Sequence, residues 1–355
     1  MKPVRVLIWG FGAMGSGMAG MLLDKRGVEI AGVCDTNPGL EGKSLFAALD
    51  RRANGHPDVR IRGEIASILS PGCADIALLA TDSFTKKAFP KLKRLMENKL
   101  NVISTAEQMA YPKAAEPELA DEIDRLARQN GVSVLGTGIN PGLIMDLLVI
   151  LLTGACRDIR HIRAERINSL SPYGPAVMEE QGVGLSPDEF RAKADSGALA
   201  GHVGFHESIR MIADAIGWPL SRPVAQSMEP IVSRVERKTR YADVQPGRVA
   251  GCLMKGYGQV AGQEAIAMIH PQQVEPEKEG TKTGDYITIS GTPDIHLSIT
   301  PEVSGGIGTI AMCVNMIPHV INASPGLKTM LDLPVPRAIL GDMRDLIRGT
   351  VGIKE

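Results

Sequence analysis

One carboxylate of this chain, Glu107, follows an apolar run at a place where reaction chemistry is expected. The run Asn101–Ser104 is typical of a buried parallel strand, and open parallel sheets bind their ligands beyond the carboxyl ends of the strands. A carboxylate at this position can act as a general base or bind an ammonium group. The position equally suits an acid at a helix start, which the helix dipole stabilises. The residues alone leave both interpretations open.

A glycine-rich turn near the start of the chain has the spacing of a phosphate-binding loop. The apolar run 4–9 leads into Gly10-Phe11-Gly12-Ala13-Met14-Gly15, after which apolar residues recur at helical spacing. Gly10 permits the tight turn, Gly12 lets the backbone approach a pyrophosphate, and Gly15 lets the helix pack on the strand. A helix that begins near Ala13 and Met14 would hold the phosphates with its free N–H groups. The alternative is a turn without a ligand, but the order of strand, turn and helix favours a nicotinamide or flavin dinucleotide.

The next apolar run, 28–34, ends on an acid, Asp35, at about the spacing from the glycines at which such folds place a ribose-binding carboxylate. Its charge would repel a 2′-phosphate, so it favours NAD over NADP. Four nearby arginines could offset that preference: Arg51, Arg52, Arg60 and Arg62. The alternative is an ordinary residue of the turn that follows the strand.

Two further strand ends carry candidate cofactor-binding residues. The apolar run 76–80 ends at Thr81, and the run 132–135 leads into a second glycine-rich turn, 136–142, which contains Asn140 and Pro141. Small residues in that turn would let a nicotinamide ring approach, and the turn is also a candidate hinge between domains. Because the carboxyl ends of parallel strands share one edge of a sheet, we expect Asp35, Thr81, Glu107 and Asn140 to surround one crevice.

The order of these elements predicts an α/β fold with two domains. Alternating strands and helices over residues 1–145 predict a Rossmann domain with a doubly wound parallel sheet, joined by a helix at 309–322 and by the C-terminal tail. Residues 146–308 contain mostly strands of alternating polarity and one clear helix, 204–216. They predict a second α+β domain with a mixed or antiparallel sheet.

Composition narrows the class of protein. The chain has 355 residues and a net charge of −1, so we expect neither nucleic acid nor an anionic membrane as a partner. The longest apolar stretch, 147–152, is too short to span a bilayer, and the first strand leaves no room for a signal peptide. The five cysteines are scattered and form no CxxC motif, which is typical of reduced thiols in the cytoplasm.

Three histidines are candidates for a site in the second domain. His202 and His206 are four residues apart beside Glu207, a spacing that can bind a metal. No third ligand is evident, so we expect no metal. His270 lies at the end of an apolar strand, where it either lines a pocket or simply ends the strand. The serines and cysteines form no nucleophile motif of the GxSxG type.

Several sequence blocks together resemble the 2,4-diaminopentanoate dehydrogenase family, which is related to dihydrodipicolinate reductases and includes the native amine dehydrogenases. The similarity extends over nearly the whole chain. It is carried by residues 9–15, 104–112, 136–142, 201–208, 315–318 and 323–334. The resemblance implies a Rossmann domain, a second domain for substrate binding and dimerisation, and a homodimer, and the scattered cysteines predict a cytoplasmic location. It also implies NAD(P)-dependent oxidative deamination of an amine or diamino acid to a ketone and ammonia, together with the reverse reductive amination.

The resemblance assigns roles to single residues. Glu107 matches the block that holds the family's essential glutamate, so the resemblance implies that it is catalytic. Asn140 and Pro141 would lie by the nicotinamide, and Leu143, Tyr173 and His270 would line the substrate pocket. One segment departs from the family pattern, in which a basic pair follows the first strand of the second domain. Here residues 169–175 contain no basic residue, which admits a simpler amine or ketone, or a different diamino acid, as substrate.

Three other functions remain as alternatives. Reductases of cyclic imines carry paired histidines and a lysine before a PSGT-like turn, and this chain has no such block. Sugar oxidoreductases carry Glu-Lys-Pro after the corresponding strand, whereas this chain has Glu107-Gln108-Met109. The third alternative is a sensor that binds NAD without catalysis.

Overall fold

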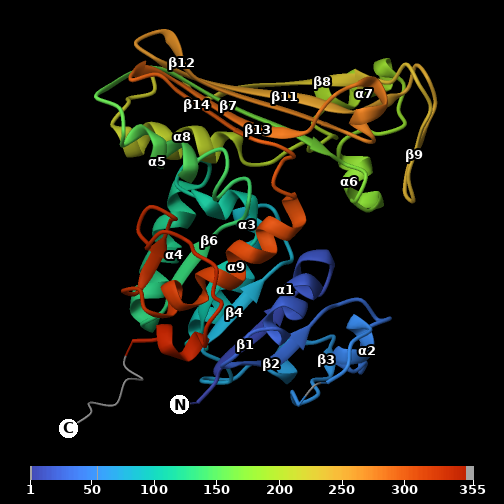
Figure 1. Ribbon diagram of the computed structural model, residues 1–355. Helices are drawn as coiled ribbons and strands as arrows, with labels where there is room; N and C mark the ends of the chain where they lie inside the picture. Colours follow the sequence, from blue (N-terminus) through green and yellow to red (C-terminus); the bar gives the residue numbers. More distant parts are fainter. Residues whose placement is uncertain (1, 54, 349–355) are drawn as a thin grey trace. The chain divides into compact units, whose positions relative to one another are not determined.

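The computed structural model describes residues 2–53 and 55–348, so the residues 349–355 of the predicted C-terminal tail lie outside the described residues. The chain divides into two compact units. Unit 1 comprises residues 1–142 and 305–355, and unit 2 comprises residues 143–304 (Figure 1). The predicted fold class is confirmed, since unit 1 contains a parallel sheet with helices and unit 2 a mixed sheet.

The sheet of unit 1 has seven strands in the order β15-β6-β5-β4-β1-β2-β3, and its strand pairs are parallel. Its central strands are buried because helices cover both faces, and β4 is buried at every position. The strands are β1 (Val4–Trp9), β2 (Val28–Cys34), β3 (Ile61–Arg62), β4 (Ile76–Leu79), β5 (Asn101–Ser104), β6 (Ser133–Gly136) and β15 (Gly326–Lys328).

Helices α1 and α9 pack against each other, as do α3 and α4. The helices of unit 1 are α1 (Ala13–Leu23), α2 (Leu45–Leu49), α3 (Thr85–Glu97), α4 (Pro117–Asn130) and α9 (Gly305–Ile321), with short 3₁₀ turns η1 (Ile65–Ser67), η2 (Glu107–Ala110) and η4 (Met343–Leu346). The helix predicted at 309–322 therefore begins earlier, at Gly305. Gly308 lies against Ile139, where an added Cβ would come within 2.7 Å of a side-chain carbon. This tertiary contact explains a helix start that is rich in glycine, a poor helix former.

Unit 2 is built on a six-stranded sheet in the order β14-β13-β7-β12-β11-β8. The pair β12–β7 is parallel and the remaining neighbours are antiparallel, so the sheet is mixed. Its strands are β7 (Asp158–Ser169), β8 (Ala225–Val232), β11 (Val249–Val260), β12 (Gln263–Gln273), β13 (Gly284–Thr292) and β14 (Ile295–Ile299), and a separate hairpin contains β9 (Arg237–Lys238) and β10 (Asp243–Val244).

Helix α8 (Phe205–Ile216) lies along one face of this sheet (Figure 1). It approaches β11 closely because two glycines face it: a Cβ on Gly256 would lie 2.7 Å from the Phe205 ring, and one on Gly258 would lie 2.8 Å from Ile209. The other helical segments of unit 2 are α5 (Leu147–Thr153), α6 (Pro175–Glu180), α7 (Pro187–Asp195) and η3 (Pro276–Glu279). Across residues 2–53 and 55–348, no helix has the length and apolarity needed to cross a membrane.

Candidate functional site

The three glycines of the first glycine-rich turn lie in different steric surroundings. Gly10 has φ +95°, and a Cβ there would lie 2.4 Å from the Ala80 carbonyl oxygen. A Cβ on Gly15 would lie 1.8 Å from the Gly10 oxygen, so α1 packs on the turn only without a side chain. Gly12 has an ordinary φ of −72°, and a Cβ on it would meet no described atom within 4 Å.

The space beside Gly12 fits the pyrophosphate of a dinucleotide. The protein itself gives no steric reason for a glycine at this position, whereas a ligand that must approach the backbone does. Gly12 is also the N-cap of α1, and the helix has no side-chain hydrogen bond at that cap. The first turn, which begins with Ala13 and Met14, therefore presents backbone N–H groups and the positive dipole end to an anion.

Asp35, directly after β2, has a structural role that the sequence did not reveal. Its Oδ2 accepts a hydrogen bond from the Phe11 amide at 2.5 Å, and its Oδ1 accepts one from the Asn37 amide at 2.8 Å. The carboxylate thus ties the glycine turn to the turn after β2. Each carboxylate oxygen can accept more than one hydrogen bond, so ribose binding remains compatible with this role.

Thr81 follows β4 and packs against the glycine turn, since its Cγ2 would lie 2.9 Å from a Cβ on Gly10. Its hydroxyl donates to Asp82 at 2.5 Å and accepts from the Lys91 ammonium at 3.0 Å. Lys91 also pairs with Asp82 at 2.6 Å. Asp82 and Lys91 fix the Thr81 hydroxyl beside the turn, and sequence reasoning missed both.

Glu107 is the first residue of the η2 turn and is half-buried. Two hydrogen bonds anchor this turn, one to the end of β5 and one to the start of α3. The Ser104 hydroxyl accepts from the Ala106 amide at 3.2 Å, and the Gln108 side chain accepts from the Thr85 amide at 3.0 Å, at the start of α3. The carboxylate therefore projects from a well-anchored turn at the carboxyl end of β5.

The second glycine-rich turn follows β6 and lies against the turn that carries Glu107. A Cβ on Gly136 would lie 2.1 Å from the Met109 carbonyl carbon and oxygen, so only glycine allows this packing. The turn is also held by α9, because the Thr309 hydroxyl accepts from the Ile139 amide at 3.1 Å. It contains the Asn140–Pro141 bond, which is cis, and ends at Gly142, where unit 1 passes into unit 2. Unit 1 thus brings Glu107 and this turn together.

Of the predicted pocket residues, Leu143, Tyr173 and His270 belong to unit 2. Leu143 is its first residue and is half-buried. Tyr173 packs on a small apolar cluster around Leu170 and Val274. His270 is 2% exposed, and its Nδ1 donates to the Arg166 carbonyl oxygen at 2.6 Å, which leaves its Nε2 as an acceptor.

His202 lies beside His270, with the ring centroids 4.8 Å apart, and also contacts Phe205. Burial of the ring, with the Arg166 charge as second cause, lowers the pKa of His202 to about 3. Burial, His202 and Arg166 hold the pKa of His270 well below its ordinary value. Both imidazoles are therefore neutral at physiological pH. His202 precedes α8, so it does not share a helix face with His206, and the described residues contain no group of three His, Cys, Asp or Glu that could hold a metal ion.

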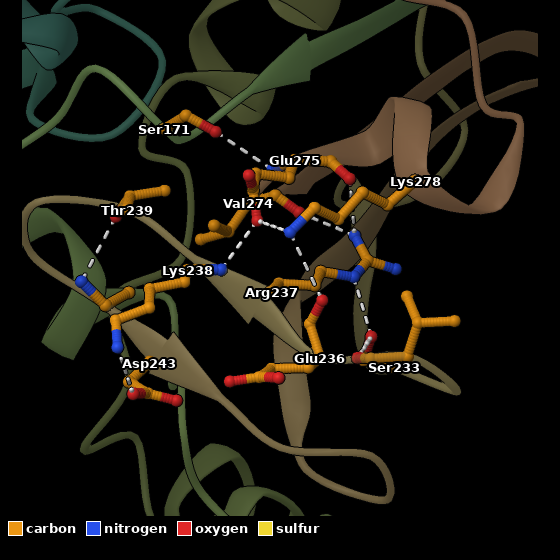
Figure 2. A network of polar contacts seen from close by, with 12 residues as sticks. Ser171, Ser233, Glu236, Arg237, Lys238, Thr239, Asp243, Val274, Glu275 and Lys278 are labelled. Atoms are coloured by element: carbon orange, nitrogen blue, oxygen red, sulfur yellow. Dashed lines mark hydrogen bonds and ion pairs between the residues drawn. The ribbon is translucent and has the colours of Figure 1, made fainter.

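The segment that carries Tyr173 is tied to a buried arginine (Figure 2). The Ser171 hydroxyl accepts from the Glu275 amide at 2.9 Å. Arg237, which is 0% exposed, donates to the adjacent Val274 oxygen at 2.6 Å and to the Ser233 hydroxyl at 2.6 Å, and it pairs with Glu279. The network joins the β9–β10 hairpin, the η3 turn and the segment after β7.

Comparisons with known proteins agree on one family. The family model of the 2,4-diaminopentanoate dehydrogenase C-terminal domain matches residues 143–349. The chain is 61% identical over 347 residues to the 2,4-diaminopentanoate dehydrogenase of Acetoanaerobium sticklandii, with 98% of each chain covered. It is 23% identical over 356 residues to an amine dehydrogenase of Streptomyces virginiae, covering 95% of this chain and 98% of that protein. The solved structure of an amine dehydrogenase from Mycobacterium smegmatis superposes with a TM-score of 0.84 at 27% identity, covering 95% of this chain and 97% of the other.

Proposed function

Because this chain belongs to the 2,4-diaminopentanoate dehydrogenase family of oxidoreductases, we propose that it catalyses NAD(P)-dependent oxidative deamination of 2,4-diaminopentanoate or a close diamino acid. The products are a ketone and ammonia, and the reverse reaction is reductive amination. The observation that carries the proposal is 61% identity to a 2,4-diaminopentanoate dehydrogenase over nearly the full length of both chains.

Glu107 is the proposed catalytic residue. When bound, the nicotinamide supplies the redox chemistry by accepting hydride from the amine carbon. The Glu107 carboxylate would accept a proton from the substrate ammonium group or activate the water that attacks the iminium carbon. In the reverse direction it positions ammonia. Its place at the carboxyl end of β5, in a turn anchored through Ser104 and Gln108, supports this role.

The proposed cofactor site uses the first glycine turn for the pyrophosphate, with Gly10, Gly12, Ala13, Met14 and Gly15. Thr81, Asn140 and Pro141 are proposed to contact the nicotinamide half. Asp35 is proposed to bind the adenosine ribose and to favour NAD over NADP, because its negative charge would face a 2′-phosphate. Leu143, Tyr173 and His270 are proposed to line the substrate pocket.

We further propose that the protein is a cytoplasmic homodimer formed through the sheet of unit 2. Along β7, the side chains that point away from α8 are half-buried, apart from Arg163, which is exposed. The five cysteines form no disulfide among the described residues. Light scattering of the purified protein tests the oligomeric state.

The test is a steady-state assay with 2,4-diaminopentanoate, with amines lacking a carboxylate and with ketones plus ammonia, using NAD(H) and NADP(H) in parallel. We expect turnover of the diamino acid and higher kcat/KM with NAD. Firm NADH binding without turnover of any amine or ketone would instead support a sensor. Reduction of a cyclic imine without deamination would support the reductase alternative.

A further inference from the structure

The loop 80–84, between β4 and α3, lies against the first glycine turn through Thr81, whose Cγ2 would be 2.9 Å from a Cβ on Gly10. An ion pair fixes the loop to α3, because the Lys91 ammonium lies 2.6 Å from the Asp82 carboxylate and both side chains are half-buried. The loop therefore has a defined position beside the proposed pyrophosphate site.

Gln108 joins this loop to the η2 turn through two hydrogen bonds. Its backbone amide donates to the Ser83 carbonyl oxygen at 3.1 Å, and its Oε1 accepts from the Thr85 amide at 3.0 Å. Because the Thr85 amide is a donor, it fixes the orientation of the Gln108 side chain, with Oε1 toward α3. One residue thus ties the η2 turn to the end of the loop and to the first residue of the helix.

The start of α3 depends on this glutamine because the adjacent sequence supplies no cap. Phe84 occupies the N-cap position, and no side chain there accepts a hydrogen bond from the first turn. The Thr85 hydroxyl is fully buried and has no hydrogen-bond partner among the described residues. The Oε1 of Gln108 therefore takes the place of a local cap for the Thr85 amide, from a segment more than twenty residues away.

The η2 turn that begins at Glu107 is short, so its orientation depends on anchors outside it. It comprises residues 107–110, a single turn of 3₁₀ helix, whose internal hydrogen bonds have poorer geometry than those of an α-helix. The hydrogen bond from Ala106 to the Ser104 hydroxyl fixes the turn to its own strand, β5. The two bonds of Gln108 are different in kind, because they fix the turn to the neighbouring segment, which also carries Thr81.

We propose that Gln108 is a positioning residue, which holds the Glu107 carboxylate at a fixed place relative to the bound cofactor. The connection runs from Gln108 through the loop 80–84 to Thr81 and the first glycine turn. The inference rests on the proposed function and deepens it. Proton transfer and hydride transfer at one substrate require that the base and the cofactor keep a defined separation, although they are held at the ends of different strands.

The first test is Gln108→Met, which removes the side-chain acceptor at similar length and leaves the backbone bond to Ser83. We expect kcat for amine oxidation to fall about 10- to 100-fold, up to the loss that a misplacement of about 1 Å causes, while KM and the NADH dissociation constant change less. Ser186→Ala is the control for a loss of stability alone, since it removes the cap of α7 in unit 2 and should leave kcat unchanged.

Gln108→Glu is the conservative variant, because it keeps an oxygen acceptor and places a negative charge where the α3 dipole favours one. It should recover most of the kcat that Gln108→Met loses. Each protein is compared at its own pH optimum, since an added carboxylate raises the pKa of an acid beside it. Full kcat in Gln108→Met, or a loss that Gln108→Glu does not relieve, would overturn the inference.

A double variant tests whether Gln108 acts through Glu107. If it does, Glu107→Gln combined with Gln108→Met should have the same kcat as Glu107→Gln alone, because there is no carboxylate left to misplace. Losses that multiply in the double variant would show that Gln108 acts independently of Glu107 and would overturn the inference.

Hydrogen exchange measured by mass spectrometry tests the same link without turnover. In Gln108→Met, the amides of residues 104–112 should exchange about three- to tenfold faster than in the wild-type protein, the effect of losing one hydrogen bond. Equal exchange in the two proteins would overturn the inference. Faster exchange in the variant of a protein that turns over no amine or ketone would instead overturn the proposed function and leave the link between the two segments standing.

Discussion

The backbone carbonyl of Met109 lies 2.1 Å from the point that a Cβ on Gly136 would occupy. Met109 belongs to the turn that begins at Glu107, and Gly136 is the last residue of β6. Strands β5 and β6 are parallel neighbours, so the turn after β5 rests directly on the end of β6. The missing side chain at position 136 therefore sets where the Glu107 carboxylate lies.

Replacing Gly136 by alanine should push the η2 turn away from β6 and displace Glu107. We expect kcat for amine oxidation to fall about 100-fold, the order of loss that a misplacement of about 1 Å causes. The dissociation constant of NADH, measured by fluorescence titration, should change less than kcat, because the pyrophosphate turn is elsewhere in unit 1. Gly20→Ala is the control, since a Cβ there meets no described atom within 4 Å. A Gly136→Ala enzyme with full kcat would contradict this account of how Glu107 is positioned.

Gly12→Ala should weaken cofactor binding without a loss of stability. The added Cβ meets nothing in the protein and the backbone has an ordinary φ, but the methyl group would occupy the space proposed for the pyrophosphate. We expect the NADH dissociation constant to rise at least about tenfold at an unchanged melting temperature. Gly10→Ala is the contrast, because its clash with the Ala80 carbonyl should destabilise the fold by about 1–3 kcal/mol. Unchanged NADH affinity in Gly12→Ala would argue against the proposed cofactor site.

Acid should destabilise unit 2 through its buried histidines. The folded-state pKa of His202 is about 3, below its ordinary 6.5, and that of His270 is also strongly lowered. The unfolded chain thus binds more protons than the folded one below about pH 6.5, so stability is complete above that pH and is lost as the pH falls toward 3. Urea unfolding between about pH 7.5 and pH 5 measures this loss of stability in a range where most carboxylates do not yet titrate. The free energy of unfolding of His202→Gln should fall less steeply with acid than that of the wild-type protein. Equal slopes in the two proteins would contradict the assignment of this pH dependence to His202.

Removing the buried arginine of Figure 2 should destabilise the protein strongly. Arg237→Met leaves Glu279 and the Val274 carbonyl without their partner, and breaking a buried pair of this kind costs about 3 kcal/mol. The change is measured as the free energy of unfolding in urea. Arg234→Met is the matched control, because Arg234 is exposed on the same segment and its loss should have little effect. Equal stability of the two variants would show that the network contributes little.

Local sequence patterns predicted a large part of the fold of this protein. The glycine turn, the acid at the end of β2 and the alternation of strands and helices indicated the Rossmann fold, because each depends on residues close together in sequence. The family resemblance, carried by short blocks, is confirmed. By contrast, the contact of Gly136 with Met109 and the pairing of Arg166 with Asp285 join distant segments, and no local pattern reveals them. The spacing of His202 and His206 can bind a metal, but α8 begins only at Phe205, so the two residues share no helix face.

The central claim is that Glu107 performs the proton chemistry of amine oxidation. The most direct measurement is the rate of NADH formation from 2,4-diaminopentanoate by the wild-type protein and by Glu107→Gln, together with NADH affinity of both. Loss of a general base lowers rates about 100- to 10,000-fold, so we expect kcat to fall within that range while NADH binds equally well. Turnover of the diamino acid by Glu107→Gln at the wild-type rate would contradict the account.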